Sequence, residues 1–179
     1  MFKFLVLFSL TLLLLMLPQL SELFRWQANL VDQNQWWRIV TGSFTHTNLY
    51  HLGMNLVGYW LLAYLFHARY KRYAVETLIL ATAVGIGLLF TSTQNYYGLS
   101  GALHGLFAVY ATREVMSGKR SSWLLLIGLG LKIAAENSGM MPISSASLIG
   151  ARISTESHLI GSLVGLAIPF IQRSTRRLG

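Results

Sequence analysis

The segment GLSGALHG, at residues 98–105, places a serine between glycines and repeats glycine at Gly101 and Gly105. A second segment, HLIGSLVG at residues 158–165, also repeats glycine with a spacing of four. Because glycine has no β-carbon, helices with this spacing can bring their backbones very close together. The two segments therefore predict a pair of tightly packed helices. Taken alone, the first segment is equally typical of an ordinary packing face made of small residues, and an isolated histidine such as that of the second is more often structural than catalytic.

The composition around these segments is that of a membrane protein. Of the 179 residues, 54% are hydrophobic and only 11% are charged, whereas soluble domains carry about one-quarter charged residues. The formal charge of +8 comes from Lys and Arg in short clusters between apolar runs, so a nucleic-acid partner is not predicted. Cysteine is absent, which excludes a disulfide framework, a thiolate metal site and a cysteine nucleophile.

The apolar stretches predict an all-α membrane protein with a single domain, residues 1–179, and six transmembrane helices. These spans are expected at about residues 3–20, 50–67, 74–92, 98–116, 122–138 and 155–171. The first span is also similar to the core of a secretion signal. No small-residue cleavage site follows it, so an uncleaved span is favoured.

The distribution of Lys and Arg predicts the orientation, because cytoplasmic loops collect cations near the ends of spans. In the six-span arrangement, most of the cations fall on one side. They are Lys3, Arg69, Lys71, Arg72, Arg113, Lys119, Arg120, Arg173, Arg176 and Arg177. Only Arg25, Arg38 and Arg152 fall on the other side. We therefore expect both termini in the cytoplasm, with the second, fourth and sixth spans starting at the outer face.

Polar side chains gather at the outer start of these three spans. Such groups are costly inside hydrocarbon and are often functional. A neutral imidazole can take the proton of a serine hydroxyl, so Ser100 is a candidate nucleophile and His158 a candidate base. His51 and Asn55 lie four residues apart, on one face of the second span. Both can donate hydrogen bonds to the negative oxygen that forms during acyl transfer.

The acidic residues near this level have a structural interpretation. Glu136 lies four residues after Lys132 in the fifth span, and a structural ion pair between the two is favoured. Glu156 is two residues from His158 and is expected to point elsewhere. No carboxylate is therefore expected to orient His158, which predicts a Ser–His dyad.

With these residues in place, the sequence resembles the rhomboid intramembrane serine proteases over nearly its whole length. Residues 98–101 are similar to the family's G-x-S-G nucleophile motif, and residues 158–165 to the base motif of its sixth span. In the first loop, Trp37 and Arg38 resemble the family's Trp-Arg pair, with His46 following at the family's distance. Residues 51–55 resemble the second-span motif that supplies oxyanion contacts.

The resemblance implies a rhomboid-like bundle with Ser100 and His158 as catalytic residues and His51 and Asn55 as oxyanion donors. It implies no cofactor and no metal. It also implies supporting roles for Gly98, Gly101, His104, His46, Trp37 and Arg38.

One departure points to a branch of the family, because His104 stands where rhomboids commonly carry a tyrosine that supports the base. We expect its ring to stack on His158. In so short a chain, the segment 98–105 resembles the rhombosortase branch. That branch implies a bacterial inner-membrane enzyme, opening toward the periplasm, that cleaves the carboxy-terminal glycine-glycine sorting segment of membrane-anchored proteins.

Four alternatives stay open from the sequence. The chain could be a general rhomboid protease of other single-span substrates, or a non-catalytic rhomboid-like binding protein. A transporter or channel would favour internal repeats and broken helices, which the sequence does not indicate. A metal site built from His46, His51, His104 and His158 would lack the tight ligand spacing of catalytic zinc. In the protease interpretation, the fifth span and its outer loop, residues 140–150, are the expected gate for substrate.

Overall fold

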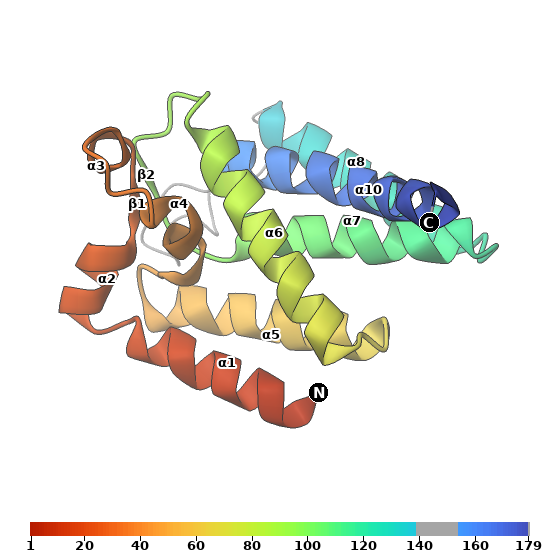
Figure 1. The fold of residues 1–179 in the computed structure, drawn as a ribbon, viewed down its shortest axis with the longest axis horizontal. Coiled ribbons are helices and arrows are strands. Elements are labelled where there is room, and N and C mark those ends of the chain that lie inside the picture. The colour runs from red at the N-terminus through yellow and green to blue at the C-terminus, as the bar shows by residue number, and fades with distance from the viewer. Residues whose placement is uncertain (139–153, 179) are drawn as a thin grey trace.

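A computed structural model gives the fold (Figure 1) and describes residues 1–138 and 154–178. Its long helices are α1 (Phe2–Leu14), α5 (Leu49–Leu65), α6 (Tyr70–Leu88), α7 (Ser100–Met116), α8 (Ser122–Asn137) and α10 (Thr155–Leu178). One of these helices lies at each of the six predicted stretches. The first is shorter than expected, and α10 continues past residue 171. The loop of the expected gate, residues 140–150, lies outside the described residues.

A sharp bend separates α1 from α2 (Pro18–Phe24), and their axes meet at 97°. Proline disfavours a helical conformation in the residue before it, and Leu17 is accordingly non-helical, with a φ of −59° and a ψ of 131°. Within the described chain, this bent pair together has the length and hydropathy of a membrane span, whereas no helix meets both conditions by itself.

Helix α7 is the central helix of the bundle. It packs against α5, α6, α8 and α10, and most of its residues between Gly101 and Thr112 are buried. A helix that is apolar or small on all sides is suited to such a position. The outer surface of the bundle carries many exposed large apolar side chains, among them Phe2, Leu7, Phe90, Leu124 and Leu163. Soluble proteins rarely expose so much apolar surface.

The contact between α7 and α10 is made by backbone atoms. A β-carbon added to Gly161 would lie 2.0 Å from the carbonyl oxygen of Gly101, and one added to Gly165 would lie 2.2 Å from that of Gly105. Neither distance is possible for real atoms, so these glycines are required for the helices to meet. The close packing predicted from the two glycine-rich segments is confirmed.

The first loop folds into short elements, some of which pack against α6. These elements are α2, β1 (Trp26–Gln27), α3 (Ala28–Asp32), α4 (Arg38–Thr41) and a 3₁₀ turn at Gly42–Phe44. Strand β1 pairs antiparallel with β2 (Asn95–Tyr96), so that Trp26 lies opposite Tyr96. The indole of the fully buried Trp26 donates a hydrogen bond to the carbonyl oxygen of Gly85, at 3.0 Å. The first loop is thereby joined to α6 and to the segment that leads into α7.

Candidate active site

Ser100 is the first residue of α7, and the backbone bends at Leu99, directly before it. Gly98 has a φ of +101°, a conformation that glycine adopts far more readily than other residues. The hydroxyl of Tyr96 donates a hydrogen bond to the Gly98 carbonyl oxygen at 2.6 Å and fixes the turn. Ser100 is therefore held at a helix N-terminus, where backbone N–H groups have no partner within the helix.

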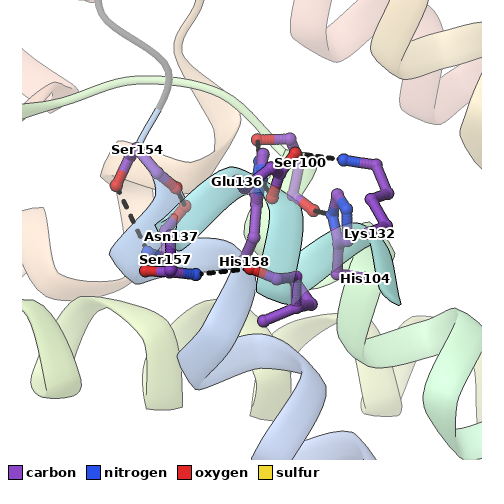
Figure 2. A network of polar contacts seen from close by, with 9 residues as sticks. Ser100, His104, Lys132, Glu136, Asn137, Ser154, Ser157 and His158 are labelled. Atoms are coloured by element: carbon purple, nitrogen blue, oxygen red, sulfur yellow. Dashed lines mark hydrogen bonds and ion pairs between the residues drawn. The ribbon is translucent and has the colours of Figure 1, made fainter. Parts of the chain in front are cut away.

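His158 lies in the first turn of α10, directly opposite Ser100 (Figure 2). This turn is stabilised by Ser154, whose hydroxyl accepts a hydrogen bond from the backbone N–H of Ser157 at 3.3 Å, as expected of an N-cap residue. The His158 Nε2 atom lies 2.9 Å from Ser100 Oγ, although the two residues are 58 apart in sequence. The predicted nucleophile and base are thus within hydrogen-bond distance.

A carboxylate contacts the other side of the same imidazole. Glu136 Oε2 lies 2.8 Å from His158 Nδ1, and both side chains are buried. The prediction that no carboxylate orients His158 is wrong. Glu136 belongs to the last turn of α8, which reaches the end of the bundle where α10 begins. In the sequence, the feature that could have indicated this contact is a carboxylate near the outer end of an apolar helix.

The ion pair predicted between Lys132 and Glu136 is confirmed, and it uses the carboxylate oxygen that does not face His158. Lys132 Nζ contacts Glu136 Oε1, while Oε2 contacts the imidazole. Glu136 therefore bridges a lysine and a histidine, so the pair is part of the Ser100–His158 cluster rather than separate from it.

His104 lies one turn after Ser100 on α7 and covers a face of the His158 ring. The two rings are stacked, with centroids 4.0 Å apart and planes at 18°, as predicted. His104 Nδ1 donates a hydrogen bond to the carbonyl oxygen of Ser100 at 2.7 Å, which fixes the orientation of the His104 ring. The stacking limits the tilt of the His158 ring about its side-chain bonds.

His51 and Asn55 converge on Gly98, two residues before Ser100. Asn48 caps α5 by accepting a hydrogen bond from the His51 N–H at 2.8 Å. A β-carbon on Gly98 would lie 2.6 Å from His51 Nε2 and 3.4 Å from Asn55 Nδ2. Glycine at this position therefore leaves room for both donors beside the turn that carries Ser100.

His46 contacts this group from the first loop. Its ring is 3% exposed and meets His51 edge to face, with centroids 5.0 Å apart. Burial, with a smaller contribution from the neighbouring His51, lowers the pKa of His46 to about 3. The ring is neutral at physiological pH.

Trp37 and Arg38 hold the first loop together. The Trp37 indole donates a hydrogen bond to the carbonyl oxygen of Leu23 at 3.1 Å. The buried Arg38 donates to the carbonyl oxygens of Glu22 and Arg25, at 2.9 Å and 2.7 Å. These bonds are all internal to the first loop.

Three side chains of the cluster have the chemistry of metal ligands. Ligand atoms of His104, Glu136 and His158 all lie within 4.8 Å of one another. The two imidazoles are stacked nearly parallel, so their in-plane lone pairs do not converge on one point. Both nitrogens of His158 also have partners, in Ser100 and Glu136. This geometry fits a hydrogen-bonded relay better than a metal centre.

The Rhomboid domain family model matches residues 33–175, and the chain belongs to the rhomboid family. It is therefore an integral membrane protein with an all-α fold. The resemblance found in the sequence is confirmed at the level of the family.

Similar proteins carry the name rhomboid protease GlpG. That of Yersinia pestis (strain Pestoides F) is 28% identical over 148 residues, covering 81% of this chain and 51% of the relative. That of Yersinia enterocolitica serotype O:8 is 28% identical over 151 residues, covering 81% of this chain and 52% of the relative. The chain spans about half the length of these curated relatives.

Proposed function

We propose that this protein is an intramembrane serine endopeptidase in which Ser100 is the nucleophile and His158 the general base. The observation that carries the proposal is the 2.9 Å separation of Ser100 Oγ and His158 Nε2. A serine becomes a useful nucleophile when a positioned base can take its proton. Membership of the rhomboid family, whose similar members are named as proteases, supports the same activity.

In the proposed reaction, Ser100 Oγ attacks the scissile carbonyl carbon while its proton passes to His158. The carbonyl oxygen becomes an oxyanion, which the backbone N–H of Ser100 and the side chains of His51 and Asn55 stabilise. His158 then gives its proton to the leaving amine. Water hydrolyses the resulting acyl-enzyme, with His158 again acting as base.

The proposed topology has six spans, at the residues expected from the sequence, and both termini in the cytoplasm. The active site opens toward the periplasm of a bacterial inner membrane. The positions of Lys and Arg support this orientation. Ser100, His51 and His158 lie in the first turns of α7, α5 and α10. Ser100 contacts His158, and His51 lies against Gly98, so all three belong to one end of the bundle.

The proposed substrates are membrane-anchored proteins with a carboxy-terminal transmembrane segment preceded by a glycine-glycine motif. Glycine is a poor helix former, so such a segment unwinds at low cost to expose its peptide bond. The assignment to the rhombosortase branch rests on the segment 98–105, in which His104 stands where rhomboids commonly carry a tyrosine.

A cleavage assay tests both levels of this proposal. The reporter ends in a glycine-glycine motif, an apolar span and a basic tail, and a second reporter replaces the two glycines with leucine. Wild type is compared with Ser100→Ala and His158→Ala, and with Ser117→Ala as a control at an exposed serine. The folding of each protein is confirmed by its melting temperature in detergent.

Wild type and the control are expected to cleave the first reporter, whereas the Ser100 and His158 variants are not. Equal cleavage of the leucine reporter would contradict the proposed glycine preference but would still support protease activity. Cleavage by Ser100→Ala at the wild-type rate would overturn the mechanism.

A further inference from the structure

We infer that Glu136 is a positioning residue for His158, so that the reacting unit is a Ser100–His158–Glu136 relay rather than a dyad. The inference rests on the proposed function, because it concerns how the proposed base is held. Glu136 Oε2 lies 2.8 Å from His158 Nδ1, and Ser100 Oγ lies 2.9 Å from Nε2 of the same ring. Each ring nitrogen thus has one partner, as Figure 2 shows.

The contact with Glu136 selects one tautomer of the imidazole. An ionised carboxylate can only accept hydrogen bonds, so the proton of a neutral His158 lies on Nδ1. The lone pair then lies on Nε2 and faces the Ser100 hydroxyl. This is the tautomer that a base must have in order to take the serine proton.

Lys132 keeps the carboxylate of Glu136 ionised. Glu136 is almost fully buried, and an unpaired buried carboxylate would take up a proton rather than stay charged. Lys132, whose side chain is 43% exposed, contacts the oxygen that His158 does not use. The lysine thus supplies the counter-charge from the bundle surface without competing for the ring.

The relay moves a single proton. As the bond forms between Ser100 Oγ and the carbonyl carbon, the hydroxyl proton passes to His158 Nε2 and the carbonyl oxygen gains the negative charge. The imidazolium keeps its Nδ1 proton, which stays hydrogen-bonded to Glu136. No proton passes to Glu136, whose charge instead stabilises the cation that appears in the transition state.

Other titratable groups also face His158 and enter any pH profile. His104 of α7 stacks on the ring, and His51 of α5 interacts with it electrostatically. Lys132 of α8 contacts the ring's partner Glu136, and Glu156 lies two residues before His158 on α10. Glu136 differs from the rest because its anionic oxygen contacts a nitrogen of the ring directly. Its removal is therefore expected to change the proton affinity of the base as well as its orientation.

The test is the pH profile of kcat/KM for wild type, Glu136→Gln and Glu136→Asp. Glu76→Gln serves as the matched control, because Glu76 is also a buried carboxylate but lies among arginines elsewhere in the bundle. Rates are expressed per folded molecule. The rate at which a fluorophosphonate labels Ser100 is measured in parallel.

We expect Glu136→Gln to lower kcat/KM and the labelling rate by about 10²-fold or more. The limb of the profile that falls on acidification should also move to lower pH, because the imidazolium loses its anionic neighbour. Glu136→Asp should recover part of both effects, and Glu76→Gln should show neither. A wild-type rate and an unmoved acidic limb in Glu136→Gln would overturn the inference while leaving the protease intact.

A second measurement covers the case in which Glu136→Gln does not fold. In wild type labelled with ¹⁵N-histidine, the NMR signals of His158 are expected to show the Nδ1-protonated tautomer, and the Nε2-protonated tautomer would overturn the relay. The proposed function fails separately, if wild type neither cleaves the reporter nor reacts with the fluorophosphonate.

Discussion

The two ends of the α7–α10 pair are held together by different chemistry. At the Ser100 end, the glycines of the two helices bring backbone against backbone. At the other end, Gln172 of α10 accepts hydrogen bonds from Arg72 at 2.6 Å and Arg113 at 2.7 Å. Both arginines also contact Glu76 of α6. One end is fixed by close steric fit, and the other by long side chains that can adjust.

Each end contains a buried carboxylate, and their partners differ in kind. Glu76, only 1% exposed, is paired with two guanidinium groups, which stay charged under all ordinary conditions. Glu136 is shared between Lys132 and the imidazole of His158, and an imidazole, unlike a guanidinium, can be either neutral or charged in proteins. The carboxylate at one end thus has a purely architectural setting, whereas the carboxylate at the other end also belongs to the proposed active site.

Gly161→Ala should cause the largest loss of stability, because it introduces a steric clash at the end where the two helices are held by close backbone packing. Its β-carbon would lie 2.0 Å from a backbone oxygen, so the helices must separate, at a cost of about 3 kcal/mol. We expect a large fall in melting temperature and loss of cleavage. Gly128→Ala on α8 is the matched control, because no atom lies within 4 Å of its added β-carbon. Equal melting temperatures for the two variants would contradict the steric account.

Glu76→Gln should separate stability from activity at the other end. The variant leaves Arg113 and Arg72 without their anionic partner, which is expected to lower the free energy of unfolding by about 2 kcal/mol. Cleavage per folded molecule should be unchanged. Denaturant titration and reporter cleavage on the same sample measure both quantities. A loss of activity in the folded fraction would mean that the two ends are coupled.

His46 predicts how acid affects the Ser100 end. Its pKa is about 3 in the folded protein because of burial, against about 6.5 in an unfolded chain. The unfolded chain therefore binds a proton first, and stability falls as the pH drops below about 6.5, by up to about 1.4 kcal/mol per pH unit. Melting temperatures between pH 7.5 and 5 should fall more steeply in wild type than in His46→Gln. Parallel curves would contradict this role.

Substitution of His104 should give the smallest effect and tests the stacking on His158. A ring contact of this kind is worth about 1 kcal/mol, so His104→Ala should lower kcat/KM about fivefold. His104→Tyr keeps an aromatic ring and should retain most of the activity. Complete loss of cleavage in the tyrosine variant would show that His104 contributes more than ring stacking.

Much of the fold and part of the site could be predicted from the sequence. The apolar stretches predicted the helices because each contains enough hydrophobic residues for a long buried or lipid-facing element. The proximity of Ser100 and His158 followed from two glycine repeats at matching ends of two helices. This proximity could be predicted from local sequence, because the spacing of glycines determines how closely two helix backbones can approach.

The contact between His158 and Glu136 could not be predicted in the same way. The spacing of Lys132 and Glu136 shows that they share a face of α8, but it does not show which helix that face meets. The rotation of α8 about its axis decides this, and it depends on packing against α7 and α10. The hydrogen bonds of Arg38 to loop carbonyls could not be predicted either. Every residue has a backbone carbonyl, so the sequence does not indicate which residues accept these bonds.

The interlocked glycines of α7 and α10 also limit how this sequence can evolve. Added β-carbons at Gly101, Gly161, Gly105 and Gly165 would each meet a carbonyl oxygen of the opposite helix. A second substitution nearby can make a side chain smaller, but it cannot make a carbonyl smaller. No single compensating change therefore rescues a larger residue at these positions. We therefore expect sequences descended from this chain to change at the residues surrounding these four glycines before they change at the glycines themselves.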